Sequence, residues 1–141
     1  LPTSRHPEDG LTLRDAFIAA AVRCAPPGNR PTPDEIAACR DHLVAEIDAL
    51  PRIQVVVALG KIAFDAYWQL LASRGAVVKP RPAFGHGHIC RHDGLPIVIA
   101  SYHPSRQNTN TGRLTPRMMD AVFRTARKTV GEFRSYATGV D

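Results

Sequence analysis

The sequence has few cysteines and no long apolar segment. Its three cysteines among 141 residues are an odd number, which disfavours a complete disulfide framework, and they are one short of a four-thiolate metal site. The longest apolar runs, such as Val55–Leu59 and Ile97–Ala100, are far shorter than the ~20 residues that a membrane-spanning helix needs. The first ten residues lack the charged and then apolar pattern of a secretory signal. We therefore expect a protein of the cytoplasm.

The chain has the composition of an ordinary folded domain, with 44% apolar and 22% charged residues. Eighteen basic and thirteen acidic residues give a net charge of +5, which is compatible with a nucleic-acid partner without establishing one. Seven basic and three acidic residues, a net charge of +4, lie from His103 to Asp141. Such charge is typical of a solvated terminal helix, and it is also suited to contact a DNA backbone. No repeat or linker divides residues 1–141, so we expect a single domain.

Strand and helix signals alternate along the chain. Continuous apolar runs rich in β-branched residues are typical of buried parallel strands, and they predict strands at 53–59 and 96–102. The segment 11–22 is ambiguous between helix and strand, and we interpret Phe17–Val22 as a buried strand because it leads into the proline-rich loop as the other strands lead into loops. Apolar residues at helical spacing predict helices at 33–50, 61–73 and from 116 onward. Thr32 and Thr115, each followed by proline, are the predicted N-caps of the first and last helices.

A further extended segment at 84–91 reaches the strand at 96–102 through an Asp93-Gly94 turn, and residues 103–115 form a polar loop. The resulting order β-α-β-α-β-β-α predicts an α/β protein. We expect a three-layer α/β/α architecture with a central, mostly parallel sheet. In such sheets, functional groups gather at the carboxyl ends of the strands.

The polar loop at 103–115 leaves a strand and arrives at a helix start, where free backbone N–H groups favour an anion. It contains one imidazole, His103, and two guanidinium groups, Arg106 and Arg113. This mixture is suited to hold phosphates while the histidine faces a reacting group. A solvated surface loop would have the same composition, so the residues alone leave both interpretations open.

Two clusters contain metal-ligand types. Cys24 and Cys39 are separated by 14 residues of a proline-rich loop, so they could converge on a metal or pack as small apolar side chains. Alternate positions of a strand share one face, which makes a zinc site from His86, His88, Cys90 and His92 a second possibility. Gly85 and Gly87 weaken that strand, and the alternative is that one of these histidines faces a pocket while the others are exposed.

Several of these segments together resemble one family. HPSRQNTNTGRLT at 103–115 resembles the second motif of the uracil-DNA glycosylase superfamily, in the form carried by its fifth family of broad-specificity iron–sulfur enzymes. VRCAPPGNRPTPDEIAAC at 22–39 is similar to the second cysteine pair of that family and the loop between them. VVVALGKIAFDAYW at 55–68 and FGHG at 84–87 follow in the order of the family. The similarity extends over almost the whole chain.

The resemblance implies a monofunctional, monomeric DNA glycosylase that hydrolyses the N-glycosidic bond of uracil and other deaminated bases in single- or double-stranded DNA. His103 matches the motif histidine that stabilises negative charge on the departing base. His86 and Gly87 match residues close to the substrate pocket. The implied DNA contacts are Pro104, Ser105, Arg106, Asn108, Asn110, Thr111, Gly112 and Arg113.

The resemblance also implies that Cys24 and Cys39 are the third and fourth ligands of a structural [4Fe–4S] cluster. The first motif of the family and the first two cluster cysteines are not found in residues 1–141, and the chain begins at Leu1. We expect them to precede Leu1, so that this chain is the carboxyl-terminal two-thirds of an enzyme. Relatives with strict uracil preference carry an Asn shortly before the third cysteine, whereas residues 18–22 here are apolar. Loss of this hydrogen-bonding group predicts a broad range of deaminated bases, including hypoxanthine.

Two alternatives of a different class remain open. One is a non-catalytic iron–sulfur module that binds damaged DNA and releases no base. The other is a zinc-dependent hydrolase that uses His86, His88, Cys90 and His92.

Overall fold

Two β-branched runs form the centre of a small mixed sheet in the computed structural model, which describes residues 16–19 and 32–138. Strands β1 (Val55–Leu59) and β3 (Ile97–Ser101) pair in parallel, with Val57 opposite Ile99. The short strand β2 (Ile89–Cys90) pairs antiparallel with β3, so the strand order is β1-β3-β2. The predicted parallel pairing of the two apolar strands is confirmed. The extended segment expected at 84–91 is a strand over two residues only, because Gly87 adopts a positive φ of 77° and turns the chain.

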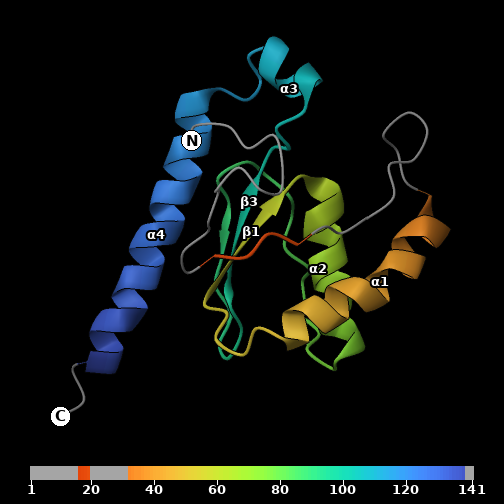
Figure 1. The fold of residues 1–141 in the computed structure, drawn as a ribbon, viewed down its shortest axis with the longest axis vertical. Coiled ribbons are helices and arrows are strands. Elements are labelled where there is room, and N and C mark those ends of the chain that lie inside the picture. Colours follow the sequence, from red (N-terminus) through yellow and green to blue (C-terminus); the bar gives the residue numbers. More distant parts are fainter. Residues whose placement is uncertain (1–15, 20–31, 139–141) are drawn as a thin grey trace, which may run out of the picture.

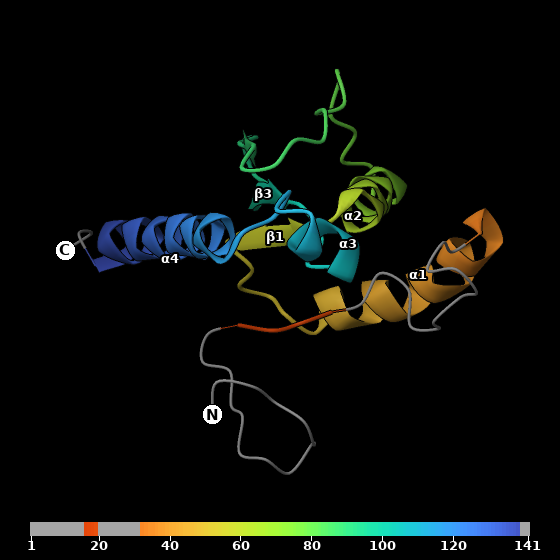
Figure 2. The same cartoon turned by 90° about the horizontal axis from the view of Figure 1, so that it is seen from above.

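Helices cover both faces of this sheet. Helix α4 (Pro116–Thr138) lies on one face and helix α2 (Lys61–Ser73) on the other, with helix α1 (Pro33–Asp48) packed beside α2 (Figures 1 and 2). Alternate strand residues supply the two faces. Ile97 and Ile99 pack with Val122 of α4, whereas Val98 and Ala100 belong to the core on the α2 side. The predicted three-layer α/β/α architecture is confirmed. Within the described residues, the sheet has one parallel and one antiparallel strand pairing.

Helices α1, α2 and α4 begin where the sequence predicts. The hydroxyl oxygen of Thr32 accepts a hydrogen bond from the backbone N–H of Glu35 at 3.2 Å, at the start of α1. Thr115 accepts one from the N–H of Met118, also at 3.2 Å, at the start of α4. These side chains satisfy amide groups that have no partner within the helix. Helix α2 begins at Gly60 without a side-chain cap.

The interpretation of Phe17–Val22 as a buried strand is wrong for the part that the structure describes. Residues 16–19, red in Figure 1, run without strand pairing, and the side chains of Phe17 and Ile18 are 55% and 75% exposed. Residues 20–22 lie outside the described residues. An apolar run becomes a strand only where a neighbouring strand completes its backbone hydrogen bonds, and residues 16–19 have no such neighbour in the described ranges.

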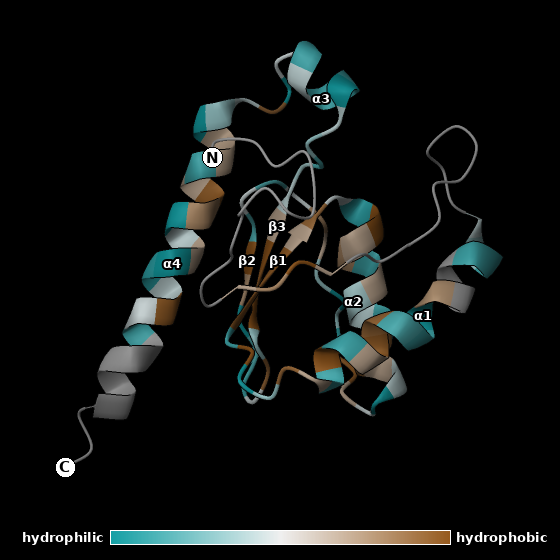
Figure 3. Ribbon diagram, in the orientation of Figure 1, coloured by the Kyte–Doolittle hydropathy of each residue, from teal (hydrophilic) through white to brown (hydrophobic). Residues whose placement is uncertain are grey.

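The core on the α2 side is aromatic. Phe64 and Trp68 meet edge to face with their ring centroids 5.9 Å apart, and Phe64 also meets Phe84 at 5.5 Å. Figure 3 shows that the strands are mostly apolar, while much of α4 is hydrophilic because one face of this helix meets solvent. Within the described ranges, no helix has the combined length and apolar content needed to cross a bilayer.

Replacing Tyr67 with Phe should remove a loss of stability at alkaline pH. Burial raises the pKa of Tyr67 to about 12, while the Arg74 guanidinium acts in the opposite direction. In the unfolded chain this phenol ionises near pH ~10. The stabilisation by neutral Tyr67 is therefore complete below pH ~10 and is lost as the pH rises through the higher, folded-state value. Urea unfolding from pH ~9 to ~12 should show Tyr67→Phe gaining stability relative to the wild type. A constant difference across that range would contradict the prediction.

Candidate active site

The parallel pairing of β1 and β3 brings two predicted functional segments together. The carboxyl ends of both strands lie at one edge of the sheet, where the N–H of Gly60 donates to the carbonyl oxygen of Ser101 at 2.8 Å. Gly60 has a φ of +99°, and a Cβ atom at this position would lie 3.1 Å from Cβ of His103. Glycine therefore permits both the turn into α2 and the close approach of His103.

His103 itself is exposed at the end of β3. Its backbone carbonyl accepts hydrogen bonds from the N–H of Ser105 at 2.8 Å and from Nδ2 of Asn108 at 2.9 Å. No hydrogen bond to the imidazole ring is formed by any described residue. The backbone is thus fixed, while the ring is left available to an external partner.

The segment after His103 contains a short helix, where the sequence predicted a loop throughout. Helix α3 (Arg106–Asn110) begins at Ser105, whose Oγ accepts from the N–H of Asn108 at 3.2 Å. The hydroxyl of Thr111 donates to the carbonyl oxygen of Gln107 at 2.7 Å. Serine and threonine side chains compensate backbone groups that a short helix leaves unpaired, and that compensation makes a helical turn possible in this polar segment.

Leu114 anchors the end of this segment. Its side chain is buried, and its N–H donates to the carbonyl oxygen of Asn108 at 2.9 Å. Gly112 turns the chain with a φ of +74°. As a result, α3 projects beyond the carboxyl ends of the strands (Figure 1). The structure brings the predicted DNA-contact residues together on this projection, with six of them exposed: Pro104, Arg106, Asn110, Thr111, Gly112 and Arg113. Ser105 and Asn108 are half-buried and maintain the conformation of the segment.

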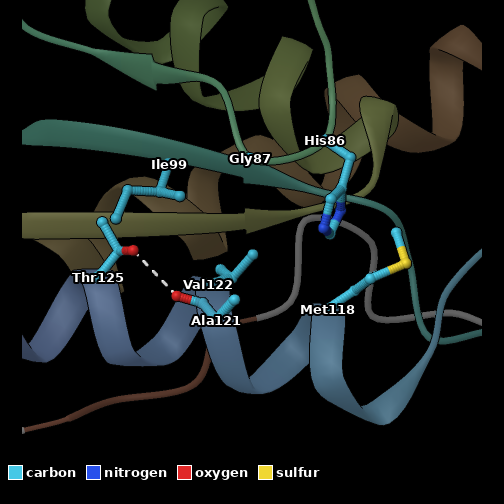
Figure 4. A pocket seen from close by; sticks show the side chains of 7 residues that line it. All are labelled: His86, Gly87, Ile99, Met118, Ala121, Val122 and Thr125. Atoms are coloured by element: carbon cyan, nitrogen blue, oxygen red, sulfur yellow. Dashed lines mark hydrogen bonds between the residues drawn. The ribbon is translucent and has the colours of Figure 1, made fainter.

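His86 and Gly87 lie beside the same strand end. The N–H of Gly87 donates to the carbonyl oxygen of Ala100 at 2.8 Å, and the N–H of Tyr102 donates to Nδ1 of His86 at 3.0 Å. His86 and Gly87 contribute to the wall of a cavity of about 300 Å³ between the sheet and α4 (Figure 4). His103 does not line this cavity. The predicted pocket histidine thus contributes to the cavity wall, whereas the predicted catalytic histidine follows Tyr102 directly in the chain.

Tyr102 is the residue that sequence reasoning missed. Its ring stacks on that of His86, with centroids 4.9 Å apart, and the Arg113 guanidinium carbon lies 4.8 Å from its centroid. Stacking and cation–π attraction thus join the cavity to the α3 segment. The available signal was an aromatic residue directly before His103, but the sequence alone assigns it only to the end of a strand.

The proposed zinc site is wrong, because the four side chains diverge. His88 contacts the carbonyl oxygen of Ala83 through Nδ1 at 3.0 Å, Cys90 is buried in the core, and the ring of His92 meets Trp68 edge-on at 5.6 Å. The turn at Gly87 breaks the strand alternation on which the prediction depended. Among the described residues, no three His, Cys, Asp or Glu side chains lie close enough together to hold a metal ion.

Cys39 is a free, buried thiol near the middle of α1, 7% exposed. Cys24, its expected partner in metal binding, lies outside the described residues, so the predicted convergence of the two thiols stays a prediction.

The motif resemblance agrees with a comparison against protein families. The model described as the uracil DNA glycosylase superfamily matches residues 4–127. This chain belongs to the uracil-DNA glycosylase superfamily.

Individual relatives indicate which family within the superfamily this chain resembles. A Type-5 uracil-DNA glycosylase of Thermus thermophilus is 46% identical over 125 residues, which are 89% of this chain and 55% of the relative. One from Mycobacterium bovis is 45% identical over 131 residues, 92% of this chain and 48% of the relative. A Type-4 uracil-DNA glycosylase of Archaeoglobus fulgidus is 34% identical over 98 residues, 68% of this chain and 48% of the relative. The predicted resemblance to the fifth family is confirmed, and the chain spans about half the length of these relatives.

Adding a methyl group at position 60 should displace His103. Gly60→Ala forces an L-residue into a positive φ and places its Cβ against His103, whereas Gly75→Ala meets the same backbone strain at φ +85° with no atom within 4 Å. Both variants should lose about 1–3 kcal/mol of unfolding free energy. The imidazole NMR signals of His103 should shift only in Gly60→Ala. Equal His103 spectra in the two variants would contradict the close approach.

Proposed function

We propose that the protein containing this chain is a DNA glycosylase that hydrolyses the N-glycosidic bond of uracil and other deaminated bases. The observation that carries the proposal is the placement of His103, an exposed imidazole fixed through its backbone at the carboxyl end of β3 and against Gly60. Membership of the superfamily supports the assignment. The reaction breaks the bond between the sugar and the base, which leaves with the electron pair of that bond. Water supplies the hydroxyl group that replaces the base on the sugar, and the remaining proton of the water neutralises the departed base.

His103 acts as the electrostatic catalyst. As the bond breaks, its electron pair moves into the departing base, and negative charge develops on a carbonyl oxygen. A donor fixed at the position of that oxygen stabilises the transition state more than the ground state. The imidazole of His103 is suited to donate this hydrogen bond because no described residue occupies it.

The α3 segment holds the DNA. The target nucleotide must leave the base stack, which costs a few kcal/mol that contacts to the backbone must offset. Exposed Arg106 and Arg113 supply charge for phosphates, and Pro104 and Ser105 approach the DNA backbone next to His103. The remaining polar contacts come from Asn108, Asn110, Thr111 and Gly112. Both double- and single-stranded DNA can reach this segment, with the enzyme working as a monomer in the cytoplasm, where the DNA of a bacterium or archaeon lies.

Cys24 and Cys39 are two ligands of a structural [4Fe–4S] cluster. Cysteine thiolates are the ligands that such clusters prefer, and the free thiol of Cys39 is consistent with this chemistry. When bound, the cluster would link Cys24 and Cys39 covalently. The chemistry of base release stays with His103.

Replacing His103 with Ala in the full-length protein should lower uracil release about 10²–10³-fold, because the donor to the departing base is lost. The fold should be retained because the side chain is exposed. Base release is measured on uracil-containing duplexes under single-turnover conditions, with exposed His42→Ala on α1 as the matched control. Unchanged release by His103→Ala would sink the assignment. DNA binding without base release by the wild type would favour the non-catalytic module.

The purified full-length protein should contain iron and sulfide and absorb visible light. Cys24→Ala and Cys39→Ala should each lose this absorbance. Cys90→Ala is the matched control, because burial raises the pKa of the Cys90 thiol and keeps it protonated. Elemental analysis that finds zinc, or no metal, in the wild type would contradict the cluster.

A further inference from the structure

The hydrogen bond between Tyr102 and His86 determines where the proton of the imidazole lies. The backbone N–H of Tyr102 donates to Nδ1 of His86 at 3.0 Å. A ring nitrogen that accepts a hydrogen bond has no proton of its own. The neutral ring of His86 therefore carries its proton on Nε2, which makes Nε2 a hydrogen-bond donor.

The position of this ring is fixed as well as its tautomer. The rings of His86 and Tyr102 stack at an interplanar angle of 29°, and the neighbouring Gly87 is bound to Ala100 of β3 through its N–H. Arg113 lies over the Tyr102 ring. Rotation of the His86 ring, or transfer of its proton to Nδ1, would break the bond from Tyr102. Nε2 of His86 therefore cannot change from a donor to an acceptor without the loss of the hydrogen bond from Tyr102.

Among the described residues that line the neighbouring cavity, His86 supplies a polar side chain with an unused hydrogen-bonding atom, Nε2. The cavity of about 300 Å³ is otherwise lined by Gly87, Ile99, Met118, Ala121, Val122 and Thr125. Figure 4 shows the His86 ring reaching toward the first turns of α4, near Met118. The hydroxyl of Thr125 already donates to the carbonyl oxygen of Ala121 at 2.9 Å, drawn as a dashed line. No described residue accepts a hydrogen bond from Nε2 of His86.

We propose that His86 recognises the substrate by donating from Nε2 to the carbonyl oxygen that deamination creates, an inference that rests on the proposed glycosylase function. Uracil and hypoxanthine carry an acceptor oxygen where cytosine and adenine carry an amino donor. Against an amino group, the Nε2 proton would face a second donor, and a buried donor without an acceptor is costly. One fixed donor in an apolar cavity thus disfavours cytosine and adenine and accepts their deaminated products, although these differ in ring size.

Two changes test this assignment in the full-length protein: one removes the acceptor oxygen from the substrate, and the other removes the donor from the protein. DNA containing pyrimidin-2-one lacks the O4 oxygen of uracil. His86→Phe keeps an aromatic ring to stack on Tyr102 and lacks the donor. We expect His86→Phe to release uracil about ten-fold more slowly or worse, with a much smaller effect on pyrimidin-2-one. The ratio of the uracil rate to the pyrimidin-2-one rate should therefore be lower in the variant than in the wild type, an effect that a purely structural role would not produce.

The controls separate this inference from the proposed function. His42→Phe, at an exposed position of α1, should keep the wild-type ratio. If the wild type releases no base, the glycosylase proposal is overturned. If the wild type releases uracil and His86→Phe keeps the same ratio, only the role of His86 is overturned. ¹⁵N NMR of wild-type His86 needs no variant, and it should find the proton on Nε2. A protonated Nδ1 in the neutral ring would overturn the inference even if His86→Phe fails to fold.

Discussion

The parallel pairing of β1 with β3 is the constraint on which the site depends. It places the carboxyl ends of the two strands at one edge, where Gly60 and His103 lie so close that a Cβ atom at position 60 would be 3.1 Å from Cβ of His103. Without this register the α3 segment would start elsewhere and Tyr102 would not reach His86. The pairing is stabilised from both faces, because the same strands bury alternate side chains against α2 and α4. The pairing of β1 with β3 therefore contributes both to the stability of the fold and to the geometry of the candidate site.

The sequence was sufficient for those parts of the fold that depend on local patterns. Helix starts follow from Thr32 and Thr115, whose hydroxyl groups act within a few residues, and β1 and β3 follow from continuous β-branched runs. Prediction was wrong where an element depends on a distant partner. Phe17 has the composition of a buried strand residue, yet it is exposed in the described structure because nothing pairs with its segment there.

In the candidate site too, features that follow from local sequence could be predicted, whereas features that depend on tertiary contacts could not. The position of the loop with His103 and Arg113 at a strand end could be predicted from chain order and strand direction, whereas His86 was expected near the pocket only from the family resemblance. The zinc hypothesis for residues 86–92 was wrong because alternation along a strand requires several residues of regular backbone, and a single positive φ at Gly87 ended it. The role of Tyr102 was beyond sequence reasoning, since stacking of three side chains from separate segments is a property of tertiary geometry alone.

The contacts of His86 and Arg113 with the Tyr102 ring also limit insertions and deletions in the segment 106–112. Arg113 reaches the Tyr102 ring from the far end of α3, so the number of residues between them is matched to the turn at Gly112 and the anchor at Leu114. An insertion or deletion within 106–112 would withdraw the guanidinium and leave one face of the aromatic group without support. Most exposed connections accept changes of length freely. The length of this one is constrained, because Arg113 at its far end must reach the Tyr102 ring that stacks on His86.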